Sequence, residues 1–237
     1  MTFVLPRYAD DTAGQPSLDH PDYRSTALRH PTQPLVVLPQ RLTEVTGPLL
    51  GEERVGELDH DLTRQHAGDP LGQRIVVHGR VLDGDGRPVP ATLVEIWQAN
   101  AAGRYRHVVD ETRAPIDPNF TGAGRVMTDA EGNYRFVTVK PGAYPWKNHP
   151  NAWRPAHIHL SLFGRAFTQR LVTQMYFPDD PLFGQDPIFN AVRDPAARQR
   201  MISRYDHDRT EPGWALAYAF DIVLRGRDAT PLDDDDD

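Results

Sequence analysis

Proline and glycine punctuate this chain from end to end, with 22 prolines and 18 glycines among 237 residues. Proline breaks helix interiors and glycine favours turns, so long helices have little room to form. The intervening segments are short and rich in β-branched and aromatic side chains. Regularly spaced strands joined by turns predict a mainly β protein, folded as a β-sandwich with long loops and one or two short helices.

The strand pattern begins after Gln73. A strand is predicted over 74–82, then the turn Asp83-Gly-Asp-Gly86 and a returning strand over 91–98. The same pattern recurs around the turn Asp129-Ala-Glu-Gly132. The other predicted strands cover 125–128, 134–139, 157–163, 167–177 and 215–224. In the last strand, the two-residue period puts the large side chains at 216, 218, 220, 222 and 224 on one face. A cap-then-proline pair, Asp194-Pro195, predicts a short helix over 196–204.

Three regions are expected along the chain. Residues 1–70 show neither the helical nor the two-residue strand period of apolar side chains, and they contain proline-bounded pieces. They are interpreted as an extended N-terminal arm that packs on the core or on a partner, with a short helix near 43–50. Residues 71–226 form one sandwich domain. Residues 227–237 form a disordered acidic tail, since five aspartates at 233–237 repel one another. These five account for most of the net charge of −7 and leave −2 for the rest of the chain.

Composition excludes several classes of function. There are no cysteines, which removes disulfides, thiolate metal sites and cysteine nucleophiles. No run of eighteen apolar residues is present, and no basic stripe suits nucleic acid. The first residues lack the charged start and long apolar stretch of a secretory signal, so a cytoplasmic protein is expected.

The most informative stretch is Trp153-Arg-Pro-Ala-His-Ile-His-Leu-Ser-Leu-Phe163. Strand alternation turns the apolar side chains at 158, 160 and 162 toward the core and His157, His159 and Ser161 away from it. Two imidazoles side by side suit one metal ion. His-x-His pairs also occur by chance, as hydrogen-bonded pairs at a sheet surface, and the spacing leaves both interpretations open.

Further ligands would have to be carboxylates, another histidine or tyrosines. Two histidines and a carboxylate would indicate Fe(II), and a distant residue such as Asp129 could supply the carboxylate. Tyr105 and Tyr144 also stand at loop or strand ends, where side chains converge on sites. Most tyrosines pack their rings and hydrogen-bond their hydroxyls, so packing is the ordinary interpretation of each of these two taken singly.

Several motifs together are similar to the iron-binding signature of the intradiol aromatic-ring dioxygenases. They are Tyr144-Pro-Trp146 and Trp153-Arg-Pro-Ala-His-Ile-His159, with Gly103-Arg-Tyr-Arg-His107 and Asp117-Pro-Asn-Phe120 resembling the protocatechuate branch of that family. The resemblance extends from about residue 21 to residue 225. It implies that Tyr105, Tyr144, His157 and His159 bind one non-haem Fe(III) per chain, with solvent hydroxide as a fifth ligand and Tyr144 as the ligand that leaves when substrate arrives.

The resemblance also implies a pocket. Trp97, Trp146, Gln174 and Ile188 would wall it, although Trp97 and Ile188 are equally compatible with core packing. Arg154 would lie next to the ring being cleaved and act on the charge that develops there; the alternative is a surface ion pair. Tyr23 matches a family tyrosine that meets the substrate carboxylate.

The implied reaction is cleavage of protocatechuate (3,4-dihydroxybenzoate) by O2 to 3-carboxy-cis,cis-muconate, a step of aromatic catabolism in the β-ketoadipate pathway. Chains of this branch pair with a homologous α subunit in a hetero-oligomer, and only the partner that keeps all four ligands carries iron. Two rivals are the same reaction on catechol or hydroxyquinol and a non-enzymatic transthyretin-like binding module. The first usually carries a helical N-terminal dimerisation region, which is not visible here.

Overall fold

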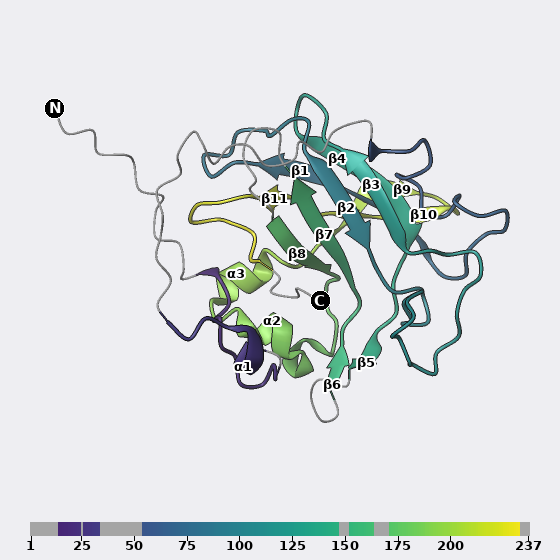
Figure 1. Cartoon of the computed structure of the whole chain (residues 1–237). Helices are drawn as coiled ribbons and strands as arrows, with labels where there is room; N and C mark the ends of the chain where they lie inside the picture. Colours follow the sequence, from purple (N-terminus) through teal and green to yellow (C-terminus); the bar gives the residue numbers. More distant parts are fainter. Residues whose placement is uncertain (1–13, 25, 34–53, 147–151, 164–170, 233–237) are drawn as a thin grey trace.

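The computed structural model describes residues 14–24, 26–33, 54–146, 152–163 and 171–232. Strands dominate these residues and the α-helices have only four or five residues each (Figure 1). The strands are β1 (Arg74–Leu82), β2 (Leu93–Trp97), β3 (Ala123–Met127), β4 (Asn133–Val139), β5 (Tyr144–Trp146), β6 (Ala152–Arg154), β7 (His157–Phe163), β8 (Leu171–Tyr176), β9 (Arg204–Glu211), β10 (Ala215–Ala219) and β11 (Ile222–Val223). The helices are α1 (Thr26–Arg29), α2 (Pro187–Ala191) and α3 (Pro195–Gln199), with a 3-10 turn, η4, at Phe183–Gln185.

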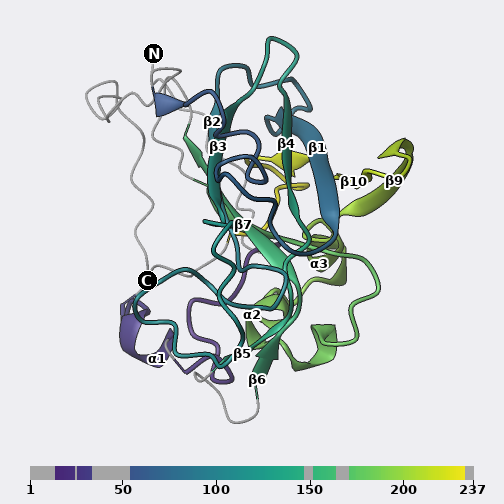
Figure 2. The ribbon, with the colours of Figure 1, turned by 90° about the vertical axis from the view of Figure 1, so that its right-hand side faces the viewer.

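Two sheets and a small ribbon make up the architecture. In the first sheet β1 pairs in parallel with β10 and β11 and antiparallel with β4, while β9 lies at the edge beside β10. The second sheet is antiparallel, in the order β3-β2-β7-β8. β5 and β6 pair with each other and lie below the second sheet in Figures 1 and 2. The hairpin of β9 and β10 projects at the side in Figure 2.

A single hydrophobic cluster fills the space between the two sheets. Ile158, Leu160 and Leu162 of β7 belong to it, as the alternation predicts. They meet Ile75 and Val77 of β1 from the opposite sheet. Two sheets sharing one core confirm the predicted mainly β sandwich.

The segment 54–72 packs on this sandwich. Leu62 is fully buried in the shared core, and its N–H donates to the carbonyl of Val137 on β4 at 2.9 Å. The proposed division into arm, domain and tail stays a prediction. The helix expected near 43–50 and the aspartates at 233–237 lie outside the described residues.

The helix predicted over 196–204 is too long, and β9 was not foreseen. Residues 201–203 leave the helix because they bond to Tyr176: its N–H donates to the carbonyl of Met201, and its carbonyl accepts from the N–H of Ser203, both at 2.8 Å. Backbone pairing with a neighbouring strand therefore ends α3 at Gln199 and leads the chain into β9.

The strand predicted over 215–224 is interrupted. Gly79 lies so close to the carbonyl of Phe220 that any Cβ there would overlap it, and the Tyr134 hydroxyl donates to the same carbonyl. β10 therefore ends before Phe220 and β11 starts after Asp221, both parallel to β1. The shared face is nevertheless confirmed, because the side chains at 216, 218, 220, 222 and 224 all pack on the core.

The strand expected over 167–177 corresponds to β8, with 167–170 outside the described residues. No helix in the described part of the chain is both long and apolar enough to span a membrane.

Candidate metal centre

The candidate site lies on the face of the second sheet that points away from the shared core. The pairing register puts Trp97 of β2, His159 of β7 and Gln174 of β8 opposite one another in one row. The next row pairs His157 with Tyr176. Directly opposed residues share a face of a sheet, so these polar and aromatic side chains are gathered by strand pairing alone.

The two imidazoles approach each other through their Nε2 atoms, which are 3.2 Å apart. Nδ1 of His157 lies 2.7 Å from the carbonyl of Pro155 and donates to it, which leaves Nε2 of that ring as the acceptor atom. The indole of Trp97 stacks on His159, with ring centres 4.8 Å apart and planes 9° from parallel. This fixing of ring orientation by outer contacts is typical of metal-ligating histidines.

Both imidazoles are buried, with 1% of His157 and 5% of His159 exposed. Burial, with smaller contributions from Arg154 and His159, holds the pKa of His157 well below its usual range. His157 is therefore neutral at physiological pH, and a neutral ring is the form that binds a metal.

Tyr105 and Tyr144 join the histidines from two different segments. Tyr105 follows the turn 100–104, and Tyr144 begins β5. The Tyr105 hydroxyl lies 3.1 Å from Nε2 of His159, and the Tyr144 hydroxyl lies 3.3 Å from Nε2 of His157. The structure thus brings all four predicted ligand residues together, with each donor atom within 3.3 Å of the next.

This donor set fits a hard metal ion. It consists of two imidazole nitrogens and two phenol oxygens, without thiolate. Within the described residues no group of three or more His, Cys, Asp or Glu could hold a metal, so the alternative with two histidines and a carboxylate finds no support there. Asp129 instead caps the turn after β3, where it accepts from the backbone of Glu131 and Asn133.

Arg154 is buried beside this centre, with 1% of its surface exposed. Its Nε lies 2.9 Å from Oδ1 of Asp186, and its NH2 group donates to Gln174 and to the Tyr176 hydroxyl. The Tyr176 hydroxyl also lies 2.6 Å from Gln174 and 3.1 Å from Oδ2 of Asp186. The surface ion pair considered for Arg154 is therefore wrong, because its carboxylate partner is fully buried.

Asp186 and Tyr176 are the residues of this network that the sequence patterns missed. A signal for Asp186 exists, because Asp186-Pro187 repeats the cap-then-proline pair used to predict α3. Asp186 does cap α2, accepting from the N–H of Ile188 at 3.2 Å. This bond ties the buried Ile188 to the carboxylate that meets Arg154.

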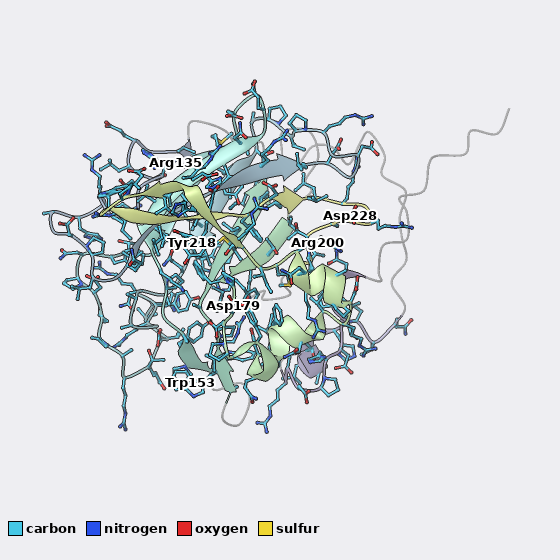
Figure 3. The ribbon with its side chains drawn as sticks, turned by 180° about the vertical axis from the view of Figure 1, so that it is seen from behind. Arg135, Trp153, Asp179, Arg200, Tyr218 and Asp228 are labelled. Atoms are coloured by element: carbon cyan, nitrogen blue, oxygen red, sulfur yellow. The ribbon has the colours of Figure 1, made fainter. Side chains whose placement is uncertain are left out.

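Trp146 and Tyr23 complete the predicted set. The indole of Trp146 lies under the guanidinium of Arg154, 5.5 Å from ring centre to carbon, and Tyr23 meets its edge at 5.0 Å. Tyr23 is buried although it belongs to the N-terminal segment. On β6 the neighbouring Trp153 faces outward at the rim of the molecule, where Figure 3 labels it.

Comparison with known proteins agrees with this fold. Residues 45–226 match the family model described as "Dioxygenase", and residues 8–41 match the model "Protocatechuate 3,4-dioxygenase beta subunit N terminal". The chain therefore belongs to the intradiol dioxygenase family.

Individual relatives are more specific. The chain is 62% identical to the protocatechuate 3,4-dioxygenase beta chain of Burkholderia cepacia, over 98% of both chains. It is 30% identical to the protocatechuate 3,4-dioxygenase alpha chain of Pseudomonas putida, over 83% of this chain and 97% of that one. Among solved structures, 3-chlorocatechol 1,2-dioxygenase from Rhodococcus opacus shares the fold, with a TM-score of 0.55 and 24% identity over 71% of this chain and 65% of the other.

Proposed function

We propose that this chain is the iron-bearing β subunit of a protocatechuate 3,4-dioxygenase, which cleaves protocatechuate with O2 to 3-carboxy-cis,cis-muconate. The observation that carries the proposal is the meeting of two histidine nitrogens and two tyrosine oxygens on one sheet face. The 62% identity to a chain of that name supports the choice of substrate. Cytoplasmic localisation stays a prediction.

The proposed cofactor is one Fe(III) held by Tyr105, Tyr144, His157 and His159. A bound trivalent iron would supply Lewis acidity toward both oxygens of a catechol. Phenolate is an anionic, hard ligand, so two tyrosines favour the trivalent state. The bond from His157 Nδ1 to the Pro155 carbonyl supports the assignment, because it leaves Nε2 as the ligating atom.

Tyr144 is proposed to move a proton as well. Its hydroxyl lies 3.3 Å from Nε2 of His157, on a ribbon of three-residue strands. A phenolate that exchanges partners there can accept a proton from a catechol hydroxyl. Tyr105 would keep its role as a ligand.

Arg154 is proposed to act on the anionic charge that develops on the substrate ring, as a directed donor of the oxyanion-hole kind. Its guanidinium is oriented by Asp186 and Gln174 and stacks on Trp146. A planar fork held in this way needs no reorganisation during the reaction. The proposed pocket walls are Trp97, Trp146, Gln174 and Ile188, with Tyr23 toward the substrate carboxylate.

A homologous α subunit is the proposed partner. The identity to an alpha chain over 83% of this chain supports common ancestry of the two kinds of subunit. Coexpression with an α chain should give a coloured hetero-oligomer with high O2 uptake. A fully active monomer or homodimer made of this chain alone would contradict that proposal.

The direct test measures iron and turnover in protein purified in air. Tyrosinate-to-Fe(III) charge transfer should make the protein red-brown, with one iron per chain and protocatechuate preferred over catechol and hydroxyquinol. Colourless protein without iron would favour the non-enzymatic sandwich. Preferred turnover of catechol or hydroxyquinol would keep the chemistry but replace the substrate.

A further inference from the structure

Asn100 lies between the two segments that carry the tyrosines. It follows β2 and Trp97 by three residues and is 6% exposed. Its side-chain oxygen accepts from the N–H of Ala102 at 2.9 Å and of Arg104 at 3.0 Å. These bonds close the turn 100–104, which delivers the chain to Tyr105.

The backbone of Asn100 reaches the other segment. Its carbonyl accepts from the N–H of Gly103 and also from the N–H of Gly142, each at 3.0 Å. Gly142 lies two residues before Tyr144, so one carbonyl joins the turn before Tyr105 to the segment before Tyr144. The side-chain amide of Asn100 donates to the Pro115 carbonyl at 3.0 Å and ties in the far end of the Tyr105 loop.

Two glycines make this junction possible. A Cβ on Gly103, whose φ is +77°, would overlap the carbonyl of Ala143, and a Cβ on Gly142 would lie 2.5 Å from the carbonyl of Ala101. The two segments therefore contact backbone to backbone. With no strand ladder between them, Asn100 supplies the hydrogen bonds that a sheet would supply elsewhere.

We propose that Asn100 is a positioning residue for the metal centre, one that holds the segments of Tyr105 and Tyr144 together so that both hydroxyls meet the histidines. The inference rests on the proposed function, because it assigns the two tyrosines as ligands of one iron. It adds an outer residue whose side chain fixes the turn before Tyr105 and whose carbonyl links that turn to the segment before Tyr144. Asn100 itself would touch neither the metal nor the substrate.

The primary variant is Asn100→Ala, which removes three side-chain hydrogen bonds and keeps the backbone carbonyl. Loss of an outer partner of a metal site costs about 10–100-fold in affinity or activity. We expect at least a tenfold faster loss of iron to a chelator and a shifted, weakened tyrosinate charge-transfer band. Asn100→Asp keeps the acceptor for Ala102 and Arg104 but loses the donor to Pro115, so it should shift the band in the same direction by less.

The matched control is Thr128→Ala, at the residue after β3 that faces the start of β2. Thr128 is also buried and also joins segments through its side chain, accepting from Thr92 N–H at 2.8 Å and donating to the Val89 carbonyl at 2.9 Å. This control should lower the melting temperature while leaving the band and the iron release rate as in the wild type.

The outcomes separate the inference from the function on which it rests. Wild-type protein that contains no iron and shows no tyrosinate charge-transfer band would refute the proposed function itself. With a normal wild type, unshifted bands and unchanged iron release in both Asn100 variants would overturn the positioning role. If Asn100→Ala does not fold, the Asn100→Asp band decides alone, and a wild-type band there overturns the proposal.

Discussion

β7 delivers His157 and His159 from the middle of a sheet, whereas Tyr105 arrives from a loop and Tyr144 from a ribbon of three-residue strands. The histidines are held by backbone ladders to β2 and β8, which fix their spacing without side-chain help. The tyrosines depend on single hydrogen bonds around Asn100 and on two close-packed glycines. A strand supplies rigid donors, and the loops supply donors that can move.

The largest effect is expected from His159→Ala, because a rigid ligand has no neighbour that can replace it. The variant should lose most of its iron and the visible band, as measured by iron content per chain and absorbance. Ser161→Ala is the matched control, since Ser161 is also buried, two residues further along the same face of β7. Full iron and activity in His159→Ala would refute its assignment as a ligand.

Tyr144→Phe tests the mobile half of the comparison. Three proposed ligands remain, so appreciable iron should be retained, but the proposed proton acceptor is gone. Loss of general-base assistance costs about 10²–10⁴ in rate. Stopped-flow mixing with protocatechuate should show slow catechol deprotonation, and wild-type turnover would remove the base role from Tyr144.

Asp186→Asn tests the buried carboxylate that pairs with Arg154 and orients its guanidinium. The amide still accepts from Ile188 N–H but leaves the buried Arg154 without its counter-charge, a change that costs about 3–5 kcal/mol in stability. We expect kcat to fall about 10–100-fold with iron content unchanged, which is less than the loss of about 10²–10³-fold that removal of a directed donor itself causes.

Asp194→Asn is the control, because Asp194 caps α3 through the same Asp-Pro pair but lies partly exposed and contacts no described site residue. It should keep wild-type kcat. A fall confined to substrate affinity in Asp186→Asn would indicate a binding role for Arg154 instead.

The smallest effect concerns His78, a strand-borne imidazole on β1 in the first sheet. Burial and Arg209 lower its pKa, and these outweigh Asp206, whose carboxylate lies 3.1 Å away, and Asp221. A histidine whose pKa falls on folding costs stability once the pH drops below its unfolded value of about 6.5, because the unfolded chain binds the proton more readily.

The wild type should therefore lose more stability between pH 7.5 and pH 5.5 than His78→Gln does, as measured by urea unfolding. His207→Gln, a substitution at an exposed position on β9 of the same sheet, is the control and should keep the wild-type dependence. Identical pH dependence in wild type and His78→Gln would contradict the prediction.

Periodicity found the strands whose two faces differ. β1 and β7 occur with the predicted bounds because their apolar side chains alternate or run unbroken against the core. β9 was missed because Arg204-Tyr-Asp-His-Asp-Arg-Thr-Glu211 carries no apolar face, and most of its residues are exposed. β5 and β6 were missed because three-residue strands, one with Pro145 at its centre, are too short to show a period.

The site residues differ in the same way: some follow from strand periodicity and others do not. The facing of His157 and His159 followed from alternation, whereas the convergence of Tyr105 and Tyr144 came only from the family resemblance. No local pattern encodes a contact between residues 100 and 142, since it depends on how two loops pack. The Asp186–Arg154 pair could not be predicted from the sequence for the same reason. The helix cap at Asp186-Pro187 could have been recognised.

The charged residues of β9 also affect whether this sheet edge can pair with a strand of another molecule. An open sheet edge presents unpaired N–H and C=O groups that invite another strand. Charged side chains of both signs lie along this edge strand, at Arg204, Asp206, Asp208, Arg209 and Glu211. A strand paired with it would have to match this mixture of charges or remove their water. Continuous sheet growth from molecule to molecule, the route to fibrils, is thus opposed at the margin where the backbone would otherwise permit it.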